Sequence, residues 1–165
     1  MKERIKKYLK EIVYFVITMT LFANAISYYK STDLNKQALS IKSVTLLDNE
    51  VFSIAEGKPI LVHYWASWCP VCKLEAPNIQ KMSQHFEVLT IAVQSGSDEQ
   101  IKEYLLENNY TFKVVNDSDA LLARASNVAV YPSTLIYDKN KNLVFSDVGY
   151  TSTFGLYLRM LWAGW

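Results

Sequence analysis

Apolar residues in this chain fall into short continuous runs separated by stretches of helical spacing. Residues 60–65 and 88–93 are predominantly apolar runs of the length typical of buried strands. The first is followed by helical spacing over residues 70–86. The second precedes a helix that Asp98 is expected to cap and that is expected to run to about Asn109. This alternation of strands and helices predicts an α/β domain.

Further patterns complete the domain on either side of this unit. Residues 41–54 alternate apolar and polar side chains around Asp48-Asn49-Glu50, which predicts a hairpin. Pro77 is expected to kink the helix over residues 70–86. The other expected elements are a strand at residues 114–115, a helix opened by Ser118 or Asp119 that ends at Ala125, a strand at 134–137, a turn at 138–142, a strand at 143–148 and a helix over 152–162. Together they predict a central mixed sheet flanked by helices.

The amino-terminal region has a different pattern. Residues 1–11 carry five basic side chains against two acidic ones, and residues 12–29 carry no charge. Eighteen uncharged residues suffice to span a bilayer, which takes about 17–25. The positive-inside rule then predicts a cytoplasmic basic segment at 1–11, a transmembrane signal-anchor at 12–29, a linker at 30–40 and an exported domain at 41–165.

A cleaved signal peptide is the alternative interpretation of the same residues. Ala23-Asn24-Ala25 has the form of a signal-peptidase site, and cleavage would follow Ala25. Both interpretations export the domain to a compartment in which disulfides persist. We therefore expect a domain outside the cytoplasmic membrane, in the periplasm or its equivalent, held by a single pass if the segment stays uncleaved.

The composition of the chain excludes some classes of function. Half of the 165 residues are hydrophobic, which is enough for a true core. The net charge is +1, and the body of the chain has no basic stripe interleaved with aromatic residues, so a nucleic-acid partner is not expected. The chain has only two cysteines, Cys69 and Cys72, and a pair so close in sequence is more often catalytic or metal-binding than a structural staple.

The spacing Cys-x-x-Cys directly after a buried strand indicates a thiol–disulfide centre. Structural zinc usually needs four Cys or His ligands, and His63 and His85 match no zinc spacing, so no metal site is predicted. Transient capture of Cu(I) by two thiolates stays open as a binding alternative.

The residues around the pair suggest how it would react. Cys69 lies at a predicted helix amino terminus, where free backbone N–H groups favour a thiolate. Pro70 suits the first helical turn because its missing N–H would have no partner there. Cys69 is therefore the expected attacking thiol, and Cys72, one turn later, the resolving thiol. The disulfide of these two residues would be the redox group, with no separate cofactor.

Several linked motifs resemble the thioredoxin superfamily. They are the strand before Trp65-Ala66-Ser67-Trp68-Cys69-Pro70-Val71-Cys72, the helix proline Pro77, and Tyr131-Pro132-Ser133-Thr134 before a late strand. The early hairpin, the Gly57-Lys58-Pro59 entry and Glu75 resemble its membrane-anchored TlpA-like branch. The Cys-Pro-Val-Cys pair with Glu75-Ala76-Pro77 is especially similar to the family of bacterial suppressor-of-copper-sensitivity protein D, which implies a link to copper tolerance. The resemblance implies a thioredoxin-like fold.

The resemblance also implies roles for individual residues. Glu75 matches an acid that lies near the disulfide and assists proton movement, and Pro132 matches a cis-proline whose backbone pairs with the substrate chain. Trp68, Pro70 and Tyr131 would add substrate contacts around Cys69.

His63 departs from the family pattern. It occupies the strand position at which thioredoxin-like proteins often carry a buried acid beneath the resolving cysteine. Two interpretations stay open for it: a proton relay to Cys72, or a hydrogen-bonded core residue without a redox role.

The expected function is that of a membrane-tethered protein thiol–disulfide oxidoreductase. Its partners would be proteins bearing thiols or disulfides, a membrane redox partner that recycles the cysteine pair, and the lipid bilayer. The alternatives are a dedicated thiol reductant for cytochrome c maturation and a copper-handling thiolate module. The direction of transfer depends on the reduction potential of the pair and is left open.

Overall fold

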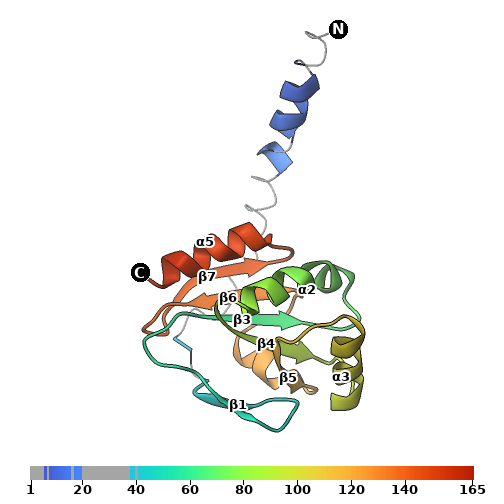
Figure 1. The fold of residues 1–165 in the computed structure, drawn as a ribbon, viewed down its shortest axis with the longest axis vertical. Helices are drawn as coiled ribbons and strands as arrows, with labels where there is room; N and C mark the ends of the chain where they lie inside the picture. The colour runs from blue at the N-terminus through green and yellow to red at the C-terminus, as the bar shows by residue number, and fades with distance from the viewer. Residues whose placement is uncertain (1–5, 7, 16, 20–37, 40) are drawn as a thin grey trace.

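The computed structural model describes residues 6, 8–15, 17–19, 38–39 and 41–165 of the chain (Figure 1). Residues 8–15 and 17–19 are helical. No helix among the described residues is long and apolar enough to cross a bilayer. Most of the predicted span at 12–29, its cleavage position and most of the predicted linker lie outside the described residues.

The elements of the domain follow the predicted order. They are β1 (Ser43–Thr45), β2 (Val51–Ser53), β3 (Ile60–Trp65), α2 (Pro70–Ser83), β4 (Glu87–Val93), α3 (Asp98–Glu107), β5 (Lys113–Asp117), α4 (Leu121–Ala125), β6 (Ser133–Tyr137), β7 (Leu143–Val148) and α5 (Thr153–Ala163). The predicted hairpin at residues 41–54 is confirmed as β1–β2, which forms a small sheet of its own.

The main sheet has the strand order β5-β4-β3-β6-β7. The three strands β3, β4 and β5 are parallel, whereas β6 runs antiparallel to β3 and β7 antiparallel to β6. The sheet is therefore mixed, with helices on its faces, as predicted (Figure 1). All six residues of β3 are buried because this strand has a neighbour on each side and is covered on both faces.

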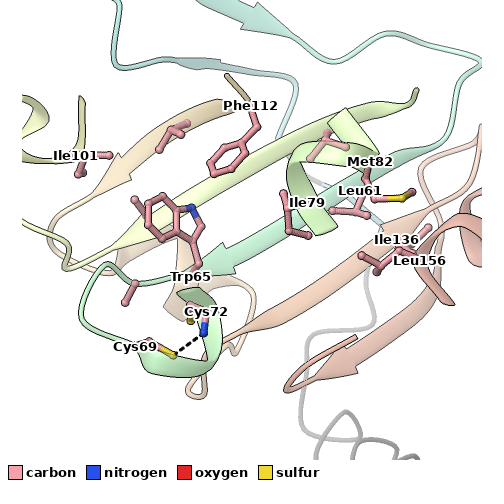
Figure 2. Packing of buried hydrophobic residues seen from close by; sticks show 14 of the residues in the cluster. Leu61, Trp65, Cys69, Cys72, Ile79, Met82, Ile101, Phe112, Ile136 and Leu156 are labelled. Atoms are coloured by element: carbon pink, nitrogen blue, oxygen red, sulfur yellow. Dashed lines mark hydrogen bonds between the residues drawn. The ribbon is translucent and has the colours of Figure 1, made fainter. Parts of the chain in front are cut away.

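Alternate side chains of β3 enter two separate hydrophobic cores. Leu61 and Trp65 pack in one cluster with Ile79 of α2 and Leu156 of α5 (Figure 2). Ile60, Val62 and Tyr64 enter the second cluster, on the opposite face, with residues of α4. Because alternate residues of a strand point to the same face, His63 lies on the α2 and α5 side, between Leu61 and Trp65.

Helix α2 carries the cysteine pair at its amino terminus and buries one stripe. Cys72, Glu75, Ala76, Ile79 and Met82 are its buried residues, at helical spacing. Pro77 lies inside the helix on its exposed side. The predicted helix over residues 70–86 was too long at its end, because α2 stops at Ser83 and β4 begins at Glu87.

Two predicted helix starts are wrong. The N-cap of α3 is Ser97 and not Asp98: its hydroxyl accepts the backbone N–H of Gln100 at 3.4 Å, and the Gln100 side chain accepts the N–H of Ser97 at 2.9 Å. This reciprocal capping box satisfies two free N–H groups, and Asp98 becomes the first helical residue.

Helix α4 begins at Leu121, three residues later than Ser118. Its N-cap position is Ala120, whose side chain makes no capping hydrogen bond. The carboxylate of Asp117 instead accepts the backbone N–H groups of Leu122 and Ala123, at 3.1 and 2.9 Å. A residue at the end of β5 therefore caps the helix from outside it.

Candidate active site

The two cysteines meet at the start of α2, just beyond the carboxyl end of β3. Cys69 is the N-cap residue, with extended backbone angles, and Pro70 occupies the first helical turn. The Sγ of Cys69 accepts a hydrogen bond from the backbone N–H of Cys72 at 3.3 Å (Figure 2). Both residues are buried, unpaired thiols. The sulfur of Cys69 therefore lies at a helix amino terminus with a backbone N–H directed at it.

A second segment, far away in sequence, faces the Cys69 sulfur. The Sγ of Cys69 donates to the backbone carbonyl of Tyr131 at 3.6 Å. The peptide bond between Tyr131 and Pro132 is cis, as the resemblance implied, and Pro132 is buried immediately before β6. The antiparallel pairing of β3 with β6 brings the Tyr131–Pro132 loop beside the cysteines.

Aromatic side chains flank this contact. Trp68 is exposed, its ring meets that of Tyr131 edge-on with centroids 6.1 Å apart, and its indole N–H donates to the carbonyl of Gln94 at 3.0 Å. Pro70 is also exposed. Trp65, in contrast, is buried against Tyr104 and Phe112 and belongs to the core. The accessible apolar surface beside Cys69 therefore comes from Trp68, Pro70 and Tyr131.

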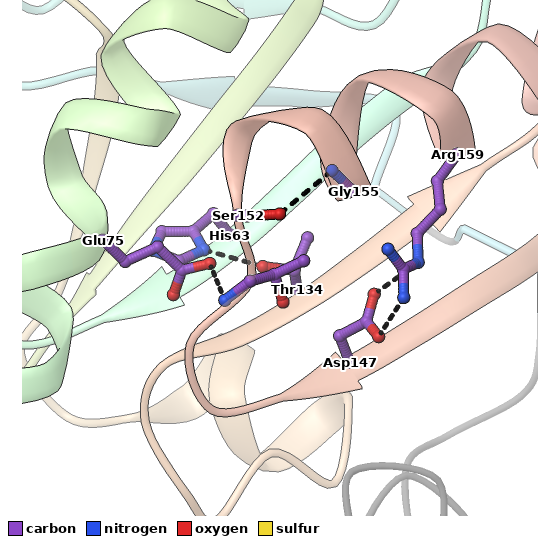
Figure 3. Close-up of polar contacts among 8 residues, drawn as sticks. His63, Glu75, Thr134, Asp147, Ser152, Gly155 and Arg159 are labelled. Carbon is purple, nitrogen blue, oxygen red and sulfur yellow. Dashed lines mark hydrogen bonds and ion pairs between the residues drawn. The ribbon is translucent and has the colours of Figure 1, made fainter. Parts of the chain in front are cut away.

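Glu75 is fully buried, one helical turn after Cys72. Its Oε1 accepts the backbone N–H of Thr151 at 3.1 Å, and its Oε2 is buried without a hydrogen-bond partner (Figure 3). Burial raises the pKa of Glu75 from 4.5 to about 8, the Thr151 hydrogen bond opposes this, and the nearby charge of Asp147 adds to it. A carboxyl of this kind exchanges its proton near neutral pH.

The resolving thiol is the more deeply buried of the two. Burial raises the pKa of the Cys72 thiol, and the contact with the Cys69 side chain and the charge of Glu75 raise it further. Cys72 is thus held as a neutral thiol and needs a proton acceptor before it can attack.

His63 lies on the same face of the sheet as α2 and pairs with a residue of β6. Its Nδ1 and the Oγ1 of Thr134, directly opposite in the strand register, share a hydrogen bond of 2.9 Å (Figure 3). Burial lowers the pKa of His63 from 6.5 to about 3, so the imidazole is neutral at ordinary pH. The described contacts of His63 are those of a buried, hydrogen-bonded strand residue.

Sequence reasoning missed the residues that fasten α2 to the start of α5 and the loop before it. The Nδ2 of Asn78 donates to the carbonyl of Thr151 at 3.0 Å, and the hydroxyl of Thr153 donates to its Oδ1 at 2.8 Å. With the Thr151–Glu75 bond, this makes three links between the two segments. No local signal marks them, because the partners lie more than 70 residues apart.

The described residues contain no group of three or more His, Cys, Asp or Glu side chains that could hold a metal ion. His85 is exposed in the turn between α2 and β4. The arrangement that the structure does provide is a thiol at a helix amino terminus, a buried second thiol and a buried proton-exchanging carboxyl.

Known proteins resemble the chain along most of its length. It is 26% identical to a thioredoxin-like protein of Haemophilus influenzae, over 97% of each chain. It is 24% identical to sporulation thiol-disulfide oxidoreductase A of Bacillus subtilis, over 62% of this chain and 67% of that one. Relatives with such names support an oxidoreductase enzyme.

The fold comparison gives the same result. A secreted disulfide oxidoreductase of Mycobacterium tuberculosis superposes with a TM-score of 0.63 over 72% of this chain and 93% of that one, at 23% identity. The predicted thioredoxin-like fold is therefore confirmed. The family model described as AhpC/TSA family matches residues 30–146, well over half of the chain. The chain belongs to the AhpC/TSA family.

Proposed function

We propose that the chain is a membrane-tethered, extracytoplasmic thiol–disulfide oxidoreductase that exchanges disulfides with protein thiols through Cys69 and Cys72. The observation that carries the proposal is the position of the Cys69 sulfur. It accepts the Cys72 N–H at a helix amino terminus and lies 3.6 Å from the carbonyl of Tyr131, which precedes a cis-proline. A reactive thiol is thereby placed beside a backbone segment that a substrate chain can join.

The exchange proceeds in two steps, formation of a mixed disulfide and its resolution. The Cys69 thiolate attacks one sulfur of a substrate disulfide, forming a mixed disulfide and releasing the other substrate sulfur as a thiolate. Cys72 then loses its proton and attacks the Cys69 sulfur. This step releases the second substrate thiol and leaves a Cys69–Cys72 disulfide, so the substrate is reduced by two electrons. The reverse sequence oxidises a substrate dithiol, and no bound cofactor takes part.

Glu75 is the proposed acceptor of the Cys72 proton. Both side chains are buried on the same face of α2, one turn apart, and the pKa of Glu75, about 8, is close to the working pH expected of a proton-transfer group. His63, whose pKa is lowered to about 3, is a weaker base at neutral pH. We therefore assign proton transfer to Glu75 and give His63 a positioning role through Thr134.

The substrate chain is proposed to bind along the Tyr131–Pro132 loop. Pro132 lies immediately before β6, and Trp68, Pro70 and Tyr131 surround Cys69 with accessible apolar surface. Main-chain pairing with this loop would recognise extended protein segments of varied sequence, and the aromatic side chains would favour apolar flanks.

Tethering and location rest on the amino-terminal pattern. The described helical residues there have apolar side chains that are half to two-thirds exposed, among them Ile12, Val13 and Phe15. Uncharged residues at 12–29, preceded by basic ones, suit a single pass with the domain outside the cytoplasmic membrane. We place the chain in the TlpA-like branch, near the suppressor-of-copper-sensitivity type, and assign it a membrane redox partner that recycles the pair.

Trapping of the mixed disulfide tests the function directly. With a disulfide-bearing protein such as insulin as the probe, the Cys72→Ser variant is expected to accumulate a covalent complex through Cys69. The Cys69→Ser variant, its matched control, is expected to form none, and a reductant should release the trapped partner. Equal trapping by both variants, or full exchange activity in Cys69→Ser, would overturn the mechanism.

The reduction potential decides the direction of transfer. A value of about −120 mV would make the pair an oxidant, and one of about −270 mV a reductant, as a cytochrome c maturation role requires. A copper-handling module predicts tight binding of Cu(I) by the reduced protein and exchange activity that is negligible. Turnover that persists in the presence of a copper chelator supports the oxidoreductase.

A further inference from the structure

Helix α5 has apolar residues on two opposite faces. Leu156, Met160 and Ala163 form the inner stripe and are buried against the sheet and α2. The outer face, half a turn away, comprises Phe154, Leu158, Leu161, Trp162 and, just beyond the helix, Trp165. A helix with a second apolar face opposite its core-facing stripe is typical of one that contacts protein or lipid on that face.

The outer face is uncovered in the described part of the chain. Trp162 is 73% exposed and Trp165 is 94% exposed, and both line a hollow with Leu158 and Leu161. The one charged residue of the helix, Arg159, does not break this surface, because its guanidinium pairs with Asp147 at 3.0 Å. Figure 1 shows α5 as an outermost element of the domain. Such a concentration of exposed apolar side chains requires a partner.

The outer face ends where the tether enters the domain. The backbone N–H of Leu39 donates to the carbonyl of Lys141 at 3.0 Å, and the Nζ of Lys139 donates to the carbonyl of Trp165 at 3.0 Å. Both contacts are made by the turn between β6 and β7. Only residues 30–38 separate the predicted membrane span from Leu39, and nine residues reach at most about 30 Å. A tethered domain is thus held with this end near the bilayer.

The charges at this end suit an anionic membrane surface. The Nζ of Lys141 donates to the carbonyl of Lys58, and Lys139, in the same turn as Lys141, contacts the carbonyl of Trp165. The acidic residue of the same turn, Asp138, is engaged by the backbone N–H groups of Asn140 and Asn142. Lysines near a bilayer surface are attracted to anionic headgroups, and tryptophans favour the interfacial region.

We propose that the outer face of α5 docks on the bilayer surface, with Trp162 and Trp165 in the interfacial region and the lysines at the headgroups. This inference rests on the tethering in the proposed function. It adds a second membrane contact, made by the folded domain itself, that sets how the domain is oriented.

The docked tryptophans and the cysteines lie at opposite ends of the domain. Gly164 packs beside Pro59, immediately before β3, so the end of α5 lies at the amino end of that strand. Cys69 follows the carboxyl end of β3, and six residues of strand span about 20 Å. The cysteines therefore lie at the opposite end of β3 from Trp162 and Trp165.

Tryptophan fluorescence tests the docking without interference from the anchor. All four tryptophans, at positions 65, 68, 162 and 165, belong to the domain. The full chain is reconstituted in vesicles of phosphatidylcholine and phosphatidylglycerol, with and without bromine near the headgroup end of the acyl chains. We expect bromine to remove up to about half of the emission, because two of the four tryptophans would lie at the interface.

Matched variants identify which tryptophans are quenched. The double variant Trp162→Phe/Trp165→Phe should lose it, whereas Trp68→Phe, the same change at the other exposed tryptophan, should keep it. Leu158→Gln should weaken the quenching, and it provides a second test if the double variant folds poorly. Sedimentation with the vesicles but no quenching would overturn the docking and leave the tether intact. Absence of sedimentation would contradict the tether and the docking together, and concentration-dependent self-association without quenching would assign the face to a second copy.

Discussion

The backbone N–H of Thr151 donates to the Oε1 of Glu75 at 3.1 Å, joining a buried carboxyl of α2 to the loop that precedes α5 (Figure 3). The second oxygen, Oε2, is buried without a partner. One hydrogen bond offsets only part of the cost of burying a carboxylate, so the protonated form is favoured. The same residue is thus a link between two segments and a store for one proton.

The stability of the domain should fall as pH rises toward 8 because of Glu75. Its pKa is about 8 in the folded domain, against an ordinary value of 4.5, so the stabilisation by its protonated form is complete below 4.5. That contribution is lost as pH rises through about 8 and amounts to at most about 5 kcal/mol. Denaturant unfolding of wild type and Glu75→Gln across this range measures the difference.

The Glu75→Gln variant should show a flatter dependence of the unfolding free energy on pH than wild type. Glu103→Gln, which changes an exposed glutamate in the same way, is the control and should leave the wild-type dependence in place. Identical pH profiles for wild type and Glu75→Gln would refute the assignment of a raised pKa to Glu75.

The rate of the resolving step should depend on Glu75 as well. If its carboxylate accepts the Cys72 proton, the wild-type rate rises with pH up to about 8. Glu75→Gln should lose that inflection and be slower by about 100-fold near the plateau. Rapid-mixing measurements of release from a preformed mixed disulfide isolate this step, and an unchanged inflection in the variant would transfer the role to another group.

His63 should remain neutral across the physiological range. Burial lowers its pKa to about 3 from 6.5, so its contribution to stability is present above 6.5 and lost as pH falls toward 3. The chain has two histidines, so His85→Gln leaves His63 as the sole imidazole for NMR. Its ring signals should not titrate between about pH 5 and 8. A midpoint near 6.5 would restore the proton-relay interpretation.

Asn78 of α2 should contribute to stability through its hydrogen bonds to Thr151 and Thr153. Asn78→Ala removes one hydrogen bond to the Thr151 carbonyl and one from the Thr153 hydroxyl, and leaves both partners unsatisfied. We expect a loss of about 1–3 kcal/mol in the unfolding free energy. Asn108→Ala, which removes a hydrogen bond at an exposed helix end, should cost no more than about 1 kcal/mol. Equal losses would show that the hydrogen bonds around Thr151 contribute no more to the unfolding free energy than an exposed one does.

The order of elements was predictable because the buried strands are long apolar runs. β3 and β4 have this pattern, and the cysteine motif marks the start of α2. The N-cap of α3 at Ser97 and the start of α4 at Leu121 were harder to predict. Neighbouring residues such as Ser97 and Asp98 are both capable caps, and the choice depends on where the preceding strand ends.

The partners of the buried polar residues could not be predicted from local patterns. His63 and Thr134 meet only because β3 and β6 pair in one particular register. Glu75 meets Thr151 across 76 positions of sequence. Spacing along α2 placed Glu75 on the side of Cys72, but it said nothing of the depth at which that side is buried.

The pairing of β6 with β3 has a consequence for when the site becomes functional. In the proposed export from the amino-terminal end, Cys69 and Cys72 would leave the membrane well before the Tyr131–Pro132 loop does. Until β6 emerges and joins β3, the thiols lack the carbonyl that faces Cys69 and the strand that carries Thr134. Catalytic competence would then arrive late in export, so a nascent chain would have little opportunity to exchange disulfides with unintended partners.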